Sequence, residues 1–171
     1  MSDQIVAGMV FASGVAVVSY GLRFLTPGGA VLQFVLGSIV FGFGGWLFVI
    51  PILAFFVPSS ILSKVNKSVR PDLQSVFEKD ECRDAAQVTA NGGIPALIVL
   101  FWYYTQKDVL YIAYLGSVAS ATADTWGTGV GTLSKSSPRI LTDFSRVETG
   151  RSGAVSPLGL FAALTGQRLS H

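Results

Sequence analysis

The chain has few of the residues on which many enzymes and disulfide-stabilised proteins depend. Its one cysteine, Cys82, excludes a disulfide within the chain and any zinc site made of several cysteines. Its one histidine, His171, is the last residue, so histidine-based catalytic triads and HExxH metal sites are excluded. Charged residues make up 13%, roughly half of the ~25% usual in globular proteins. The net charge of +2 is too small to indicate a nucleic-acid-binding protein.

What the chain does have is long apolar runs. Half of its residues are hydrophobic and 19 are glycine, as is typical of a multi-pass membrane protein. Ile5–Leu22 is 18 residues without a charge, and Phe24–Ser63 is 40. A straight helix of that second length would measure ~60 Å, about twice the ~30 Å hydrocarbon core of a bilayer. The second run must therefore turn back, and Gly42–Gly45 is the expected turn.

These runs predict an all-α fold, a polytopic transmembrane helix bundle with about six membrane-embedded segments. The expected segments are Ile5–Leu22, 28–43, 46–62, Val88–Thr105, Val109–Leu133 and Ser152–Gly166. We expect a single membrane-embedded domain, 1–171, with polar loops at 64–84 and 134–151.

The basic residues predict how the chain is oriented. Counting the crossings places Arg23 and both polar loops on one side of the membrane, with ten of the 12 basic residues. Only Lys107 and Arg168 fall on the other side. Basic residues in short loops mark the cytoplasmic face, so both loops are expected in the cytoplasm and the N-terminus outside. The expected location is the cell membrane.

Two polar segments, 81–93 and 121–135, lie where the cytoplasmic loops meet the spans. They contain carboxylates, amides, hydroxyls, cations and glycines, the groups that a metal–phosphate site requires. Carboxylates hold Mg²⁺, Arg and Lys neutralise phosphate, and glycines let backbone N–H groups approach it. The spacing of a P-loop is absent, and the glycines at 127–131 also suit helix packing.

Each of three residues in these segments can be interpreted in two ways. Asp124 lies within an apolar span, where a carboxylate serves either a functional site or a structural ion pair. Asp84 either caps the following helix or binds a metal. Asn91 either joins two helices through its amide or contacts a ligand.

The same segments resemble a known family. The matching stretches are RDAAQVTANGG at 83–93, ADTWGTGVGTLS at 123–134, RILT at 139–142 and VETGRSGAVSPLG at 147–159. They are similar to the motifs of the integral-membrane "domain of unknown function 92" family, which includes plant phytyl-phosphate kinase. This chain departs from the family pattern at Gly129, where a glutamate is usual, and at Arg151, where a threonine is usual. Members of the family generally continue for further spans beyond the point that corresponds to His171.

The resemblance implies a membrane-bound kinase. It would transfer a phosphoryl group from a nucleoside triphosphate, CTP or a similar one, to an isoprenoid (phytyl or prenyl) monophosphate at the cytoplasmic face. The expected catalytic residues are Asp124, Asp84, Arg83 and Lys135, and the two aspartates are the expected Mg²⁺ ligands. The residues expected to bind or position the phosphate are Arg139, Asn91, Thr125, Gly92, Gly93 and Gly127.

Two other classes of protein remain open. A transporter or lipid-translocating protein would use Asp124 as an ion site and would have broken helices at Gly92–Gly93 and at 127–131. A catalytically silent member of the family would be consistent with Gly129. The expected partners are membrane lipid, the isoprenoid monophosphate and a nucleotide, with no nucleic acid.

Overall fold

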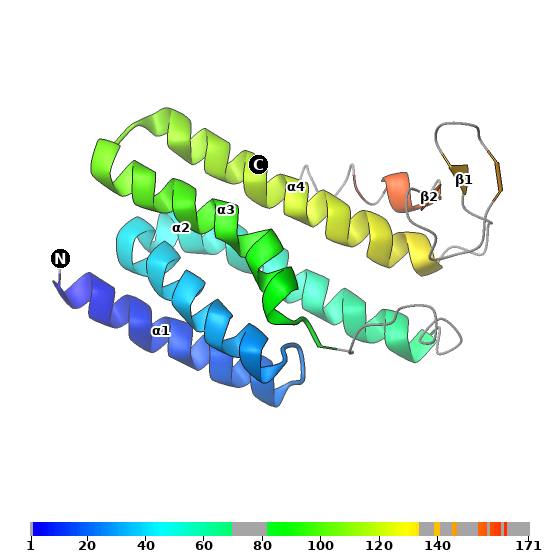
Figure 1. Ribbon diagram of the computed structural model, residues 1–171, viewed down its shortest axis with the longest axis horizontal. Helices are drawn as coiled ribbons and strands as arrows, with labels where there is room; N and C mark the ends of the chain where they lie inside the picture. Colours follow the sequence, from blue (N-terminus) through cyan, green and yellow to red (C-terminus); the bar gives the residue numbers. More distant parts are fainter. Residues whose placement is uncertain are drawn as a thin grey trace. The chain divides into compact units, whose positions relative to one another are not determined.

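The computed structural model of the protein is built of α-helices (Figure 1). It describes residues 2–69, 82–133, 139–140, 145–146, 154–156, 158–161 and 163. The helices are α1 (Ser2–Gly21), α2 (Pro27–Val69), α3 (Ala85–Thr105) and α4 (Asp108–Leu133). Two strands of two residues each, β1 (Arg139–Ile140) and β2 (Ala154–Val155), pair antiparallel.

Residue contacts divide the chain into two compact units. The first unit is Met1–Ala54 together with Asp80–Val118, and the second is Phe55–Lys79 together with Ala119–His171. Helices α1 and α3 lie in the first unit, whereas α2 and α4 each begin in the first unit and end in the second. Residues 1–171, which we expected to form a single domain, therefore divide into two compact units.

Helix α2 is interrupted at Gly45. This residue has φ 64° and ψ −161°, a combination that glycine adopts far more easily than any other residue. Figure 1 shows the chain reversing its direction after the first part of α2. The turn expected at Gly42–Gly45 is confirmed. It is required because 43 residues of continuous helix would measure ~65 Å, about twice the thickness of a bilayer core.

Small residues join α1 to the first part of α2. Gly8 and Ala12 are buried on α1. A β-carbon at Gly8 would lie 2.8 Å from the backbone nitrogen of Gly42, and one at Gly37 would lie 3.2 Å from the β-carbon of Ala12. Gly8 contacts Gly42, whereas Ala12, further along α1, contacts Gly37, which is earlier in α2. The two helices are therefore antiparallel. Small side chains permit this close approach, which supplies packing energy where lipid weakens the hydrophobic drive between helices.

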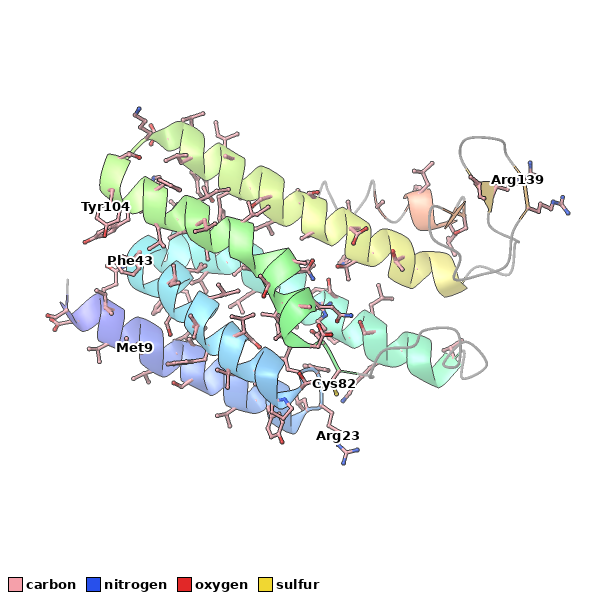
Figure 2. All side chains as sticks on the ribbon, in the orientation of Figure 1. Met9, Arg23, Phe43, Cys82, Tyr104 and Arg139 are labelled. Carbon is pink, nitrogen blue, oxygen red and sulfur yellow. The ribbon has the colours of Figure 1, made fainter. Side chains whose placement is uncertain are left out.

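One end of the first unit is aromatic. The ring of Phe48 contacts those of Trp102 and Tyr114, with centroids 4.7 and 4.8 Å apart. The Tyr114 hydroxyl also donates a hydrogen bond to the Phe48 carbonyl. Figure 2 shows Phe43 and Tyr104 at this same end. The aromatic end therefore brings the Gly45 turn close to the turn between α3 and α4.

The opposite end of the first unit is polar. Figure 2 shows Arg23 and Cys82 at this end, with the Arg23 side chain directed away from the helices. The Cys82 thiol donates a hydrogen bond to the Arg23 carbonyl at 3.2 Å. Lys107 follows α3 at the aromatic end. Within this unit, Arg23 and Arg83 therefore share one end and Lys107 lies at the other, as the count of crossings requires.

In the part of the chain that the structure describes, three helices are long and apolar enough to cross a membrane: Ser2–Gly21, Pro27–Val65 and Ala85–Thr105. The second of them contains the Gly45 turn and so holds two of the expected segments. Large apolar side chains such as Val10, Phe101 and Ile112 are exposed on the helices, where a bilayer would cover them. The all-α membrane fold is therefore confirmed.

The expected count of six crossings is not confirmed. Helix α4 does not meet the same criterion of length and apolarity, since it carries Asp108, Asp124 and many small residues. Of the expected segment Ser152–Gly166, residues 158–161 and 163 are helical, and most of the others lie outside the described residues. The polar loop expected from residue 64 begins later, because α2 continues to Val69.

Candidate functional site

The segment before α3 pairs with the turn before α2. The Arg83 N–H donates a hydrogen bond to the Phe24 carbonyl at 2.9 Å, and the Thr26 N–H donates one to the Arg83 carbonyl at 3.1 Å. Leu25, which is buried, and Arg83 thereby form a parallel β-bridge. Both backbone polar atoms of Arg83 are fixed by a part of the chain that is remote in sequence.

Asp84 is the N-cap of α3. Its backbone is extended, with φ −82° and ψ 175°, and its Oδ1 accepts a hydrogen bond from the Gln87 N–H at 2.8 Å. A negative side chain is favourable here because the N-terminus of a helix carries partial positive charge. The capping interpretation is therefore observed, and metal binding by Asp84 stays a prediction.

Arg83 is partly removed from water. Burial lowers the pKa of its guanidinium to about 10, since a low-dielectric environment disfavours the charged form. The side chain is nevertheless positive at neutral pH. A phosphate attracts such a cation more strongly than one surrounded by water, because the effective dielectric constant around it is lower.

The other residues of the first motif lie along α3. Gly92 is buried, and a β-carbon there would lie 3.1 Å from Leu36 Cδ1 of α2. Gly93 and Asn91 are half-buried. The packing of α3 against α2 is sufficient to explain the glycine at 92, and contact of Asn91, Gly92 or Gly93 with phosphate stays a prediction.

The side chains of the second polar segment, 121–135, that lie on α4 divide between two faces. Thr122 is buried, and the Trp126 indole N–H donates a hydrogen bond to the buried Ser59 hydroxyl of α2 at 2.9 Å. Asp124 is exposed and Thr125 is half-buried. Residues two positions apart on a helix differ by about 200° in direction. The carboxylate of the motif therefore lies on the opposite face of α4 from the indole.

Gly127 and Gly131 lie one turn apart on α4 and pack against Ser156, Gly159 and Ala163. A β-carbon at Gly127 would lie 3.3 Å from that of Ala163, and one at Gly159 would lie 2.6 Å from the Gly127 carbonyl oxygen. Ser156 is buried, and its hydroxyl accepts a hydrogen bond from the Gly159 N–H at 3.1 Å. Close packing accounts for these glycines, and phosphate contact by Gly127 stays a prediction.

The helix breaks that the transporter alternative requires at the glycine-rich stretches are not observed. Helix α3 is continuous through Gly92–Gly93, and α4 is continuous through 127–131. A glycine inside a helix costs only ~1 kcal/mol relative to alanine. The close packing that Gly92, Gly127 and Gly131 permit offsets that cost, so the helices remain intact.

Four of the expected or unusual residues lie in the second polar loop or just before it. Lys135 and Arg151 lie outside the described residues. Arg139 is exposed on β1, where it is paired with Val155 and forms a bridge with Arg146. Gly129 is half-buried on α4, at the position where the resembled family has a glutamate.

The described residues supply carboxylates but no closed metal cage. Among them, no group of three or more His, Cys, Asp and Glu side chains is placed to hold a metal ion. Mg²⁺ commonly uses only one or two protein carboxylates, together with water and substrate phosphates. Asp84 and Asp124 suit that mode of binding, but they belong to different units, so a shared ion stays a prediction.

Sequence reasoning missed the residues of the α1–α2 turn. The Thr26 hydroxyl accepts a hydrogen bond from the Gly29 N–H at 3.1 Å and caps α2. One turn further on, the Gln33 side-chain oxygen is buried without a hydrogen-bond partner in the described part of the chain. Thr26 followed by Pro27 is a recognisable signature of a helix start. Its pairing with Arg83 has no signal in one sequence.

The fold and the polar end define an integral membrane protein of helices with a polar, charged segment before α3. The chain belongs to the integral membrane protein DUF92 family, whose model matches residues 10–169. The expected family is thereby confirmed.

Two curated relatives are similar over most of this chain. The uncharacterized membrane protein MJ0933 of Methanocaldococcus jannaschii is 33% identical over 145 residues, which are 84% of this chain and 59% of that protein. Protein PGR of Arabidopsis thaliana is 28% identical over 175 residues, 94% of this chain and 60% of that protein. The chain thus spans about 60% of the length of these relatives. No solved structure matches it.

Proposed function

We propose that this protein is a membrane-bound kinase of isoprenoid monophosphates. It transfers a phosphoryl group from a nucleoside triphosphate, CTP or a similar one, to a phytyl or prenyl monophosphate, giving the diphosphate. One observation carries the proposal furthest: Arg83 and Asp84 lie at the polar end of the first unit, just before α3 begins. A kinase needs its charged groups at such an end, where a soluble nucleotide can reach them, whereas a carrier needs them in mid-membrane.

In this proposal the lipid lies with its isoprenoid chain among the apolar side chains and its phosphate at the polar end. Arg83, Lys135 and Arg139 bind and orient phosphate oxygens and neutralise their charge. Asn91, Thr125, Gly92, Gly93 and Gly127 position the phosphate groups. Phosphoryl transfer needs little covalent chemistry from the protein, so positioning and charge neutralisation supply most of the rate.

The proposed metal is Mg²⁺, with Asp84 and Asp124 as its protein ligands. When bound, it would neutralise negative charge on the phosphates. Asp84 Oδ1 already accepts the N–H of Gln87, so this carboxylate has a fixed orientation at the start of α3. Asp124 is exposed on α4 and accessible to a ligand.

We also propose that the protein lies in the cell membrane with its N-terminus outside. The polar segments 64–84 and 134–151 are then cytoplasmic, as is the polar end with Arg23 and Arg83. This orientation places the charged segment before α3 in the compartment that holds the nucleoside triphosphates.

A structural feature that the transporter alternative requires is absent from α3 and α4. That alternative required broken helices that offer backbone ends to a substrate, and α3 and α4 are continuous at the glycines in question. We therefore favour the kinase.

The decisive experiment uses the purified full chain in detergent or nanodiscs. It is incubated with Mg²⁺, each labelled nucleoside triphosphate in turn, and a panel of prenyl monophosphates of different chain length. We expect label to appear in the prenyl diphosphate with one preferred nucleotide. The proposal fails if no combination yields a diphosphate above the level of a mock preparation from cells without the protein.

A further inference from the structure

The turn between α1 and α2 is shaped closely around Arg83. The Arg83 N–H and carbonyl are both bonded to it, at Phe24 and Thr26. The Thr26 hydroxyl accepts the Gly29 N–H at 3.1 Å and also lies 3.5 Å from the Arg83 carbonyl oxygen. Three groups of the turn, the Phe24 carbonyl, the Thr26 N–H and the Thr26 hydroxyl, therefore contact the backbone of Arg83.

Gly29 is required by this arrangement. A β-carbon at this position would overlap the Arg83 carbonyl oxygen. The overlap is with backbone atoms, so no side-chain rotation can relieve it, and the Arg83 segment would have to move. The adjacent Gly28 has no such restriction, since its β-carbon would meet only that of Ala85, at an ordinary 3.8 Å.

The short segment that is held in this way carries the charged groups of the proposed site. Arg83 supplies the cation, and Asp84 follows directly as the cap of α3. An arginine binds phosphate well when its backbone is already fixed, because less conformational freedom is lost on binding. The turn can thus affect phosphate binding through the backbone of Arg83.

We propose that Thr26 and Gly29 are positioning residues for phosphate binding by Arg83 at the polar end of the first unit. The ligand class is a phosphomonoester, or the terminal phosphate of a nucleotide. The inference deepens the proposed function and rests on it for the identity of the substrate. It adds that phosphate affinity is determined by the first turn of α2. This turn lies outside every motif of the sequence.

The chain provides its own probe for the test. Cys82 is its one cysteine, and it adjoins Arg83 and donates a hydrogen bond to the Arg23 carbonyl. The rate at which a maleimide modifies Cys82 in the full-length protein therefore reports whether this pairing is intact. The rate is measured with Mg²⁺ alone and with Mg²⁺ plus geranylgeranyl monophosphate, CTP or inorganic phosphate.

In the wild type we expect slow modification that a phosphate ligand slows further. Gly29→Ala should raise the basal rate about tenfold, because the pairing opens locally, and should abolish the protection. Gly28→Ala, the matched control, should behave as the wild type. Protection by the prenyl monophosphate alone identifies a lipid headgroup site, whereas protection by CTP or inorganic phosphate identifies a site for soluble phosphate.

If Gly29→Ala does not fold, a second pair of variants, at Thr26, tests the same proposal. Thr26→Val removes the hydroxyl that caps α2, and Thr26→Ser retains it. Thr26→Val should weaken protection and raise KM for the phosphate ligand about tenfold with little change in kcat, the pattern of lost binding rather than lost chemistry. Thr26→Ser should restore wild-type values.

The outcomes separate the two proposals. Protection of Cys82 that depends on Gly29, without any diphosphate product, supports the positioning role and refutes the kinase. Diphosphate formation with the same KM in wild type, Gly29→Ala and Thr26→Val refutes the positioning role and leaves the kinase intact. Absence of protection by every phosphate compound in the wild type also overturns the inference.

Discussion

The indole of Trp126 and the hydroxyl of Ser59 form a hydrogen bond of 2.9 Å within the second unit, joining α4 to the later part of α2. Ser59 is fully buried, so in a bilayer the indole N–H has its partner inside the protein. The tryptophan of the ADTW stretch thus has a structural role, although the adjacent motif residues suggest chemistry. Asp124, two residues earlier, lies on the exposed face of the same helix.

We predict a measurable coupling between these two side chains. A double-mutant cycle with Ser59→Ala and Trp126→Phe should give ~0.6 kcal/mol, with an upper limit of ~1.7 kcal/mol, the range found for hydrogen bonds between membrane helices. The measurement is reversible unfolding in detergent of both single variants and the double variant. Strictly additive losses would show that the bond contributes nothing to stability.

We expect Asp124→Asn to reduce Mg²⁺-dependent phosphoryl transfer by orders of magnitude and to leave the thermal unfolding temperature unchanged. The side chain is exposed, so its replacement disturbs no packing, whereas a metal ligand loses its charge. Thr128→Val, one turn further along the same exposed face, is the matched control and should retain activity. Equal turnover of wild type and Asp124→Asn would refute the catalytic assignment. Should the wild type be inactive, turnover restored by Gly129→Glu would still favour the metal site.

Arg83→Lys should make phosphate binding depend on pH. Burial lowers the pKa of Arg83 to about 10, so the wild type stays charged and its KM for the lipid phosphate should be constant from pH 7 to about 9. The same burial would lower the pKa of a lysine below its usual ~10.4. As the pH rises, that lysine loses its proton and KM rises. The check is KM between pH 7 and 9.5, with Arg23→Lys as the exposed control; a flat profile for Arg83→Lys would contradict the burial argument.

Gly45→Ala should destabilise the protein by ~1–3 kcal/mol, the usual cost of forcing another residue into a conformation suited to glycine. The residue has φ 64° and ψ −161°. Gly14→Ala is the control, because it lies within α1 and a β-carbon there meets nothing within 4 Å. It should be neutral or slightly stabilising. Similar unfolding temperatures for Gly45→Ala and the wild type would show that the turn tolerates a side chain.

The two ends of the first unit should react from opposite sides of a membrane. Native Cys82 reports on the polar end, and Lys107→Cys in a Cys82→Ser background reports on the aromatic end. In oriented vesicles, a membrane-impermeant maleimide should reach Cys82 from the cytoplasmic side and position 107 from the other. Modification of both from one side would overturn the topology.

Much of the fold follows from where charges interrupt the apolar runs. The expected span Val109–Leu133 differs from α4 by one residue, and the expected turn at Gly42–Gly45 contains the observed break. Both depend on local properties: helix length against bilayer thickness, and the freedom of glycine at positive φ. The helix expected at 46–62 continues to Val69, because a helix tolerates charged residues such as Lys64 beyond the apolar part of a span.

The site was less predictable, since its geometry depends on residues distant in sequence. The pairing of Thr26 with Arg83 joins two loops on either side of α2. Helical periodicity places Asp124 and Trp126 on opposite faces, but which face is buried depends on where Ser59 lies. The cap at Asp84 could be foreseen, because its chemistry is local.

The Gly45 hairpin also bears on how the chain enters the membrane during synthesis. No charged residue lies between Phe24 and Ser63, so the tip of the hairpin can cross the bilayer without desolvating an ion. A single lysine or aspartate at a helix centre would add ~2.5–3.5 kcal/mol to insertion. The two helices of the hairpin can therefore insert together. In the proposed orientation, the cations Arg23 and Lys64, which flank this apolar segment in the sequence, would stay on the cytoplasmic side.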